Sequence, residues 1–202
     1  MSNAATRNAK TGNIVTPKGR ILWNAVFNPR VQKGKPKDSG KYEFSLAIPK
    51  GSDLKLLEQE ILEVGKEKFP KLFRDAGGKW PSGLKSPFKK SKDKDKLVDI
   101  ADDFPVYLTA RSKDKPGVVG PNGKADGIEP ENVYPGRWAQ MSLQVYGYDT
   151  DGNKGITFGL INVRLLDNDE ELVVGGGRVS AESEFEDATE EASGEEAGSM
   201  FS

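Results

Sequence analysis

Aromatic side chains occur together with an arginine on two stretches of this chain. Arg137 and Trp138 begin one of them, and Tyr107 and Arg111 share one side of the other. Rings of this kind stack on nucleobases, at about 1–3 kcal/mol per base, and cations bind phosphates without reading a base sequence. The chemistry that these residues predict is therefore non-covalent and suits an unpaired nucleic acid strand.

A lysine-rich stretch between residues 70 and 103 repeats this combination, because Trp80 and Phe88 are interleaved with its cations. Its glycines and prolines exclude a long regular element, so a long basic loop is expected, and a second one at residues 32–40. The alternative for the loops is a solvated surface, and the alternative for each ring is that it covers an edge of the core. The predicted contact residues are Arg20, Trp23, Lys79, Trp80, Lys85, Lys89, Lys90, Tyr107, Arg111, Arg137, Trp138, Tyr146 and Tyr148.

Carboxylates offer the main alternative chemistry. Asp99, Asp102 and Asp103 precede an expected strand, where a nuclease would hold Mg²⁺, although such clusters are more often strand ends. The chain has no histidine and no cysteine, which removes the commonest general base, the commonest metal ligands and the thiolate nucleophile. We therefore predict no catalytic residue, no metal site and no cofactor.

Charge divides the chain into two parts of opposite sign. Residues 181–202 hold eight of the 31 acidic residues and none of the 30 basic ones, so residues 1–180 carry a net charge of +7. A segment of this composition does not fold alone, and a tethered one competes for a basic groove at an effective concentration of about 1 mM. The alternative is a merely solubilising end. The residues predicted to recruit partners are Glu190, Glu191, Glu195, Glu196 and Phe201.

Five strands and one helix are expected to position these residues. The helix lies between Ser52 or Asp53 and Pro70, with Leu57 and Ile61 on its apolar face. A small number of strands separated by many glycines favours a mainly β fold. The predicted fold is a five-stranded OB-like barrel. Tyr42, Phe44 and Phe158 are expected in its core. The predicted strands are Gly19–Phe27, Lys41–Ile48, Pro105–Arg111, Arg137–Tyr148 and Gly155–Leu166.

The domain organisation that follows has three parts. Residues 1–16 are polar and unpatterned and are expected to be flexible, residues 17–174 form the barrel domain, and residues 175–202 are a glycine linker and disordered acidic tail. No apolar run is long enough to span a membrane. Because no apolar stretch follows Ala4–Asn8, a chain without a secretory signal is expected. A cytoplasmic location is expected.

Four segments carry a resemblance to a known family. Gly19–Ala25, Gly40–Leu46, Pro135–Trp138 and Ile156–Val163 recur in this order, and the likeness covers residues 17–167. They resemble a family of bacteriophage single-stranded DNA-binding proteins. The resemblance implies an OB-fold whose helix follows the second strand. It also implies work with phage replication and recombination proteins in an infected bacterium.

Three functions stay open at this point. The favoured one is sequence-independent coating of single-stranded DNA, with the tail competing for the groove and recruiting partners. The alternatives are a phage structural or assembly β-barrel and a carboxylate-dependent nuclease. A homodimer is suggested by the resemblance alone. One departure from the family is that Phe201 is penultimate rather than last, which leaves its role less defined than that of the acids.

Overall fold

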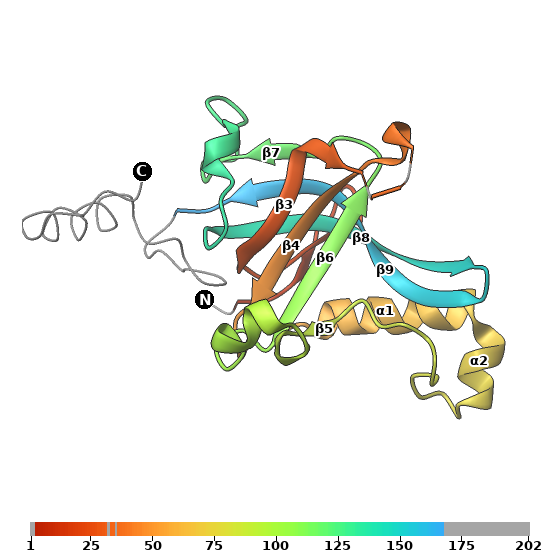
Figure 1. The fold of residues 1–202 in the computed structure, drawn as a ribbon. Helices are drawn as coiled ribbons and strands as arrows, with labels where there is room; N and C mark the ends of the chain where they lie inside the picture. Colours follow the sequence, from red (N-terminus) through yellow and green to blue (C-terminus); the bar gives the residue numbers. More distant parts are fainter. Residues whose placement is uncertain (1–2, 32, 35, 168–202) are drawn as a thin grey trace, which may run out of the picture.

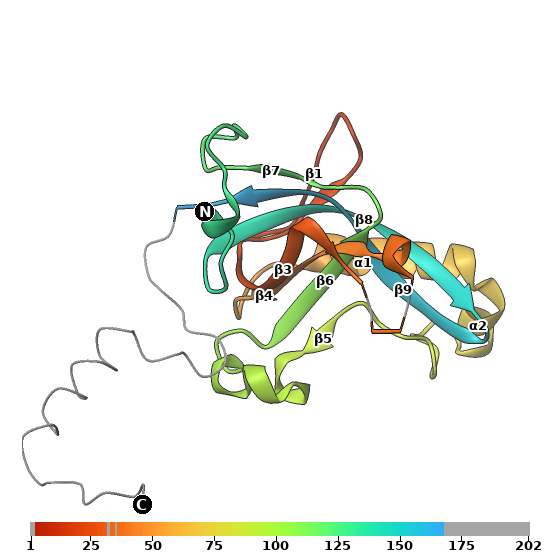
Figure 2. The same ribbon diagram turned by 45° about the horizontal axis from the view of Figure 1, so that its top comes forward.

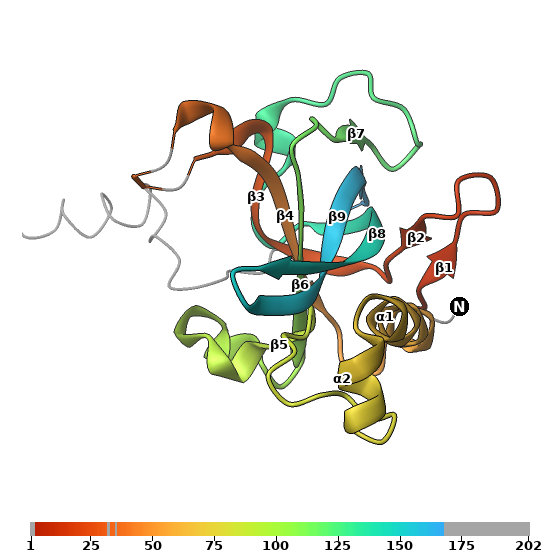
Figure 3. The ribbon, with the colours of Figure 1, turned by 90° about the vertical axis from the view of Figure 1, so that its right-hand side faces the viewer.

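Five strands close into a barrel in the computed structural model, which describes residues 3–31, 33–34 and 36–167 (Figure 1). Antiparallel pairing joins β3 to β4, β4 to β6, β3 to β8 and β8 to β9, and parallel pairing of β6 with β9 completes the ring (Figure 3). These strands are β3 (Gly19–Arg30), β4 (Lys41–Ile48), β6 (Val106–Ser112), β8 (Trp138–Thr150) and β9 (Asn153–Leu165). The five predicted strands and the OB-like barrel are confirmed.

Period-2 alternation explains why these segments form strands with one side in the barrel. Phe44, Leu46 and Ile48 of β4 fill the barrel, as do Ala139 and Met141 of β8. The alternate residues of β8 are half-buried or exposed, whereas Ser45 and Ala47 of β4 are buried on the other side of the sheet. Asp151 and Gly152 both adopt positive φ at the tip of the β8–β9 hairpin, which matches the turn predicted there. Phe158 lies in the core as expected, and Tyr42 is half-buried.

Two helices follow the second strand of the barrel. Helix α1 (Lys55–Lys68) begins just after Asp53, whose Oδ1 accepts a hydrogen bond from the Lys55 amide at 2.9 Å. Its buried face contains Leu57 and Ile61, so the predicted amphipathic helix is confirmed. Pro70 opens a second short helix, α2 (Pro70–Asp75), which the sequence analysis did not separate from the following loop. Neither helix is long and apolar enough to cross a membrane, a finding that concerns the described residues alone.

The N-terminal segment is part of the sheet. Strands β1 (Thr6–Arg7) and β2 (Ile14–Val15) form a hairpin, and β2 pairs with β8. Ile14 is buried, and the Thr16 hydroxyl accepts a hydrogen bond from the Met141 amide at 3.1 Å. Residues 1–16 were expected to be a flexible segment, and in the structure Thr6–Arg7 and Ile14–Val15 of that segment are paired strands. Two strands of two residues each are too short to show a period in the sequence, and they form because β2 pairs with β8 and β1 pairs with β2.

The lysine-rich stretch 70–103 is folded against the barrel rather than looped out. After α2 it contains β5 (Lys89–Lys90), which pairs with β6, and two 3₁₀ helices, η2 (Ser91–Asp93) and η3 (Asp95–Ile100). Leu97 of η3 is completely buried. The expected long loop is thus a chain of short elements, because a few apolar side chains fasten it to the barrel. The remaining elements are η1 (Lys37–Ser39), β7 (Gly117–Val119), which pairs with β9, and η4 (Pro130–Asn132) (Figure 2).

Candidate nucleic-acid interface

Three adjacent strands share one side that faces away from the barrel interior, here called the outer face: Trp23, Glu43, Ser45, Tyr107, Thr109 and Arg111. Of these residues, Arg111 is exposed, Trp23 is half-buried and the other four are buried. Register pairs Glu43 with Arg111, Ser45 with Thr109, and Ala47 with Tyr107. Paired residues project to the same side of a sheet, and the residues between them, such as Phe44 and Leu108, fill the barrel. Segment 91–103 lies at the start of β6, and the β3–β4 connection lies near the end of β6 (Figure 1).

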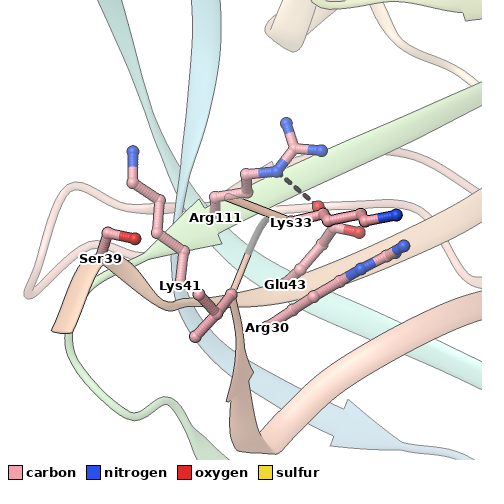
Figure 4. Close-up of a pocket in the computed structure, with 7 residues that line it drawn as sticks. Arg30, Lys33, Ser39, Lys41, Glu43 and Arg111 are labelled. Atoms are coloured by element: carbon pink, nitrogen blue, oxygen red, sulfur yellow. Dashed lines mark hydrogen bonds and ion pairs between the residues drawn. The ribbon is translucent and has the colours of Figure 1, made fainter. Parts of the chain in front are cut away.

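A basic cleft of about 800 Å³ opens where the β3–β4 connection meets the outer face. Four cations and one carboxylate line it, so a phosphate group would meet a strongly positive surface. Figure 4 shows these side chains around the cleft. The lining residues are Arg30, Val31, Lys33, Ser39, Lys41, Glu43 and Arg111.

An ion pair at the floor of the cleft fixes Arg111. The Arg111 Nε–H donates to Glu43 Oε2, and the Glu43 side chain is only 9% exposed whereas that of Arg111 is 45% exposed. The two terminal nitrogens of the guanidinium point away from Glu43 (Figure 4). A planar guanidinium held in this way can direct its remaining N–H groups at a phosphate.

Lys89 adds a further cation beside this pair. Its Nζ lies 5.6 Å from the centroid of the Tyr107 ring. Partial desolvation of its ammonium group lowers the pKa of Lys89, although the residue as a whole is exposed. Repulsion from Arg111 and Lys94 lowers this pKa further, against a partial rise caused by Glu43. A bound phosphate would relieve that repulsion. Burial also raises the pKa of Tyr107, with a smaller contribution from Asp93.

Tyr107 lies on the predicted side of β6 but is not open to solvent. It is 7% exposed, because Leu97 of η3 and Phe104 pack over it. Trp23 contacts it edge-on, with ring centroids 5.6 Å apart. The expectation of an exposed Tyr107 ring is therefore wrong, because segment 91–103 folds back over this part of the outer face.

Trp138 is half-buried at the far edge of the same surface. The Arg20 guanidinium carbon lies 4.1 Å from its ring centroid and Lys18 Nζ lies 4.8 Å away. Arg20 is itself buried and donates from Nη1 to the Gly136 carbonyl oxygen at 3.0 Å. Arg137 donates to the carbonyl oxygens of Asn132 and Leu166. These predicted contact residues therefore pack against protein, and the expectation that Arg20 is accessible is wrong.

The aromatic residues of the lysine-rich stretch also turn inward. Trp80 donates from Nε1 to the Leu84 carbonyl oxygen at 2.8 Å and packs edge-on against Phe73. Phe88 packs against Phe158 of the core. The expected alternation of exposed rings and cations is wrong here, although the lysines are exposed. These exposed lysines include Lys79, Lys85, Lys89 and Lys90.

Tyr146 and Tyr148 project from the outer side of β8, as predicted. Tyr146 is 44% exposed, the highest value among the aromatic residues that the structure describes. Its ring approaches Gly159 of β9, and Gly159 is in register with Arg111 across the parallel β6–β9 pair. Tyr146 therefore lies on the strand next but one to Arg111, on the same outward surface.

Of the four cations that line the basic cleft, three were not predicted from the sequence, namely Arg30, Lys33 and Lys41. The signal in the sequence was the lysine-rich stretch 32–40, which contains Lys33 and lies between Arg30 and Lys41. The carboxylates weighed as a metal site lie apart from this cleft, and Asp102 pairs with Lys92 at 3.5 Å. Within the part of the chain that the structure describes, no three acidic side chains gather closely enough to hold a metal ion.

Comparison with solved structures shows a shared barrel fold. The single-stranded DNA-binding protein from bacteriophage Enc34 in complex with ssDNA matches with a TM-score of 0.58 at 16% identity, over 84% of this chain and 98% of that one. The T7 bacteriophage protein gp2.5, also a single-stranded DNA-binding protein, matches with a TM-score of 0.57 at 13% identity, over 81% of this chain and 96% of that one.

Sequence comparison extends the likeness beyond the fold. Protein p50 of Acyrthosiphon pisum secondary endosymbiont phage 1 is 33% identical over 82 residues, which make up 41% of this chain and 43% of that protein. The chain thus aligns with less than half of the length of this relative. The family described as Enterobacter phage Enc34, ssDNA-binding protein, matches residues 12–196. This match covers most of the chain, which therefore belongs to the family of the Enterobacter phage Enc34 ssDNA-binding protein.

Proposed function

We propose that this chain binds single-stranded DNA without sequence preference and serves phage DNA replication and recombination, inside the infected bacterium, as a binding protein and not an enzyme. The observation that carries the proposal is the basic cleft, which opens on the outer face of an OB-like barrel. This is the face that OB-folds use for oligonucleotides. Membership of the Enc34 ssDNA-binding protein family supports the same assignment.

The cations of the basic cleft give it a positive charge, and their arrangement suits a phosphate backbone. Lys41 and Lys33 are flexible cations that can follow successive phosphates, whereas Arg111 is fixed by Glu43. Contacts of this kind do not read the bases, so they bind every sequence alike. The predicted contacts Lys79, Lys85 and Lys90 remain part of the proposal as exposed cations. A homodimer also remains a proposal.

Salt dependence tests the phosphate contacts. If about 3–5 phosphates are neutralised, log affinity for a poly(dT) oligonucleotide falls with log salt at a slope of roughly −2 to −3.5. Lys41→Gln should reduce the magnitude of that slope by about 0.7 because it removes one such contact. Fluorescence anisotropy of a labelled oligonucleotide measures both quantities.

Lys10→Gln is the matched control, because Lys10 is an exposed lysine in the turn between β1 and β2, away from the basic cleft (Figure 3). It should leave the slope unchanged. Equal slopes for the two variants would argue against a phosphate path through the cleft. Undetectable binding by the wild-type chain at low salt would favour a structural or assembly role instead. Cleavage of the oligonucleotide in Mg²⁺, abolished by Asp102→Asn, would favour a nuclease.

We also propose that the acidic segment 181–202 competes with DNA for the basic cleft and, when displaced, recruits replication proteins. This segment lies outside the described residues, and the support is its charge, which is opposite to that of the cleft. Deleting residues 181–202 should raise affinity for single-stranded DNA several-fold at low salt. The gain should shrink as salt screens the attraction.

A variant of full length separates charge from chain length. It carries Gln or Asn at the eight acidic positions of 181–202 and should bind DNA as tightly as the deletion. Unchanged or weaker binding by both proteins in the same anisotropy titration would reject the competition. The partner-binding role assigned to Glu190, Glu191, Glu195, Glu196 and Phe201 is tested separately, by asking whether replication proteins of the phage are retained by the wild-type chain and not by the deletion.

A further inference from the structure

The short strand β5 fixes the position of one lysine amine on the outer face. Strand β5 pairs with β6, and Lys89 is in register with Tyr107. Residues opposite each other in an antiparallel pair project to the same side, so Lys89 lies on the side of Tyr107 and Arg111. Its Nζ lies 5.6 Å from the centroid of the Tyr107 ring, and the residue is exposed. A nucleophilic group is thus accessible on the surface proposed to bind DNA.

The surroundings of this amine favour its neutral form. Partial desolvation is the largest cause of the lowered pKa of Lys89, and repulsion from Arg111 of β6 is the second. The Glu43 carboxylate of β4 opposes both, and Lys94, between η2 and η3, adds a smaller repulsion. An ordinary lysine is almost wholly protonated at neutral pH, so this lowering increases the fraction of free amine. A phosphate bound at Arg111 would weaken the repulsion, whereas a strand that covers the amine would strengthen the desolvation.

A desolvated lysine amine next to other cations is the kind of group that forms Schiff bases with carbonyl compounds. Single-stranded DNA contains a reactive carbonyl wherever a base has been lost, because the abasic sugar opens to an aldehyde at C1′. No base shields that carbon. The phosphates on either side are unchanged and still suit the cations of the basic cleft.

We propose that Lys89 captures abasic sites in single-stranded DNA as a reversible Schiff base. The Nζ lone pair attacks C1′ of the aldehyde, and the π electrons of the carbonyl pass to its oxygen, which takes up one amine proton. The new hydroxyl group then leaves with the second amine proton as water, and a C=N bond replaces the C=O bond. The step needs no oxidant or reductant, and water reverses it. This inference rests on the proposed function, because the cleft must bring the strand to the amine.

The test traps the Schiff base by reduction with cyanoborohydride on the full-length chain. One probe is a labelled dT oligonucleotide with a single abasic site, and the other carries a tetrahydrofuran at that site, which has no aldehyde. The wild-type chain should bind both strands in anisotropy titrations and should form a covalent band on a denaturing gel with the first strand alone. Lys89→Arg keeps the positive charge but not the amine, so it should bind both strands as the wild type does and lose most of the band.

Lys96→Arg is the matched control, because Lys96 is an exposed lysine of η3 in the same lysine-rich stretch. It should give the wild-type band, and mass spectrometry of the trapped complex should place the adduct on Lys89. An undiminished band for Lys89→Arg, or an adduct on other lysines, would overturn capture by Lys89. Binding of both strands without a band would overturn the capture while leaving the proposed function intact. Failure of the wild-type chain to bind either strand would overturn both.

Discussion

Replacing Arg111 with Gln is expected to weaken binding of single-stranded DNA by about 10- to 100-fold at low salt. A hydrogen bond to a charged group contributes about 1.5–3 kcal/mol, which corresponds to that range, and the 45% exposure of Arg111 favours its lower half. The expected loss of affinity exceeds that of removing one phosphate contact, because the Glu43 carboxylate is still present in the variant. Its carboxylate, 9% exposed, would then lie in the cleft without the guanidinium that neutralises it and would repel the phosphate.

The double variant Glu43→Gln/Arg111→Gln isolates this second contribution. It removes the repelling carboxylate together with the guanidinium, so its affinity should recover in part relative to Arg111→Gln. Anisotropy titrations of labelled poly(dT) measure all three proteins, and thermal unfolding confirms that each is folded. Wild-type affinity in Arg111→Gln would show that the strand does not pass the cleft floor.

Replacing Leu97 with Ala is expected to lower the free energy of unfolding by about 2–5 kcal/mol, the usual cost of truncating a fully buried leucine. Leu97 fastens η3 over Tyr107 in a cluster that includes Leu22 and Phe104. Its loss should also open the surroundings of Trp23, which contacts Tyr107. Urea denaturation followed by tryptophan fluorescence measures both effects, as a lower midpoint and a red-shifted native emission.

Val98→Ala provides the matched control from the next position in the chain. Val98 is 53% exposed, so its truncation removes little buried surface and should leave the unfolding curve close to that of the wild type. Equal stability of the two variants would mean that η3 is not fastened to the barrel through Leu97. The burial of Tyr107 would then need another cause.

The fold was predictable where local pattern and tertiary packing agree. The alternation of β8, with Met141 inside and Tyr146 outside, is a property of the strand itself and survives in the barrel. The apolar stripe of α1 and the turn at Asp151–Gly152 are likewise local. The short strands at Thr6–Arg7 and Ile14–Val15 were not predictable, because they are too short to show a period and Ile14–Val15 pairs with β8, far along the chain.

For the candidate site, the sequence predicted which types of residue take part but not which individual residues are accessible. Arg111 and Tyr146 were expected on outward positions, and both are there. Tyr107 was expected there too, yet it is covered by η3, and Trp138 packs with Arg20. Arg30 and Lys41 were not predicted as site residues. The sequence of a lysine-rich stretch does not indicate which other cations will lie next to it in the folded chain.

The sequence by itself determined the direction in which each strand residue points and the division of charge between a basic barrel and an acidic end, because both depend on residue type and spacing along the chain. The tertiary structure decided which outward rings are covered and which cations share a cleft. It also decided that Tyr146 lies two strands from Arg111 on the same outward side, through the parallel pairing of β6 with β9. The physical reason is that side-chain direction in a strand is a local, period-2 property, whereas accessibility depends on what folds back from elsewhere in the chain.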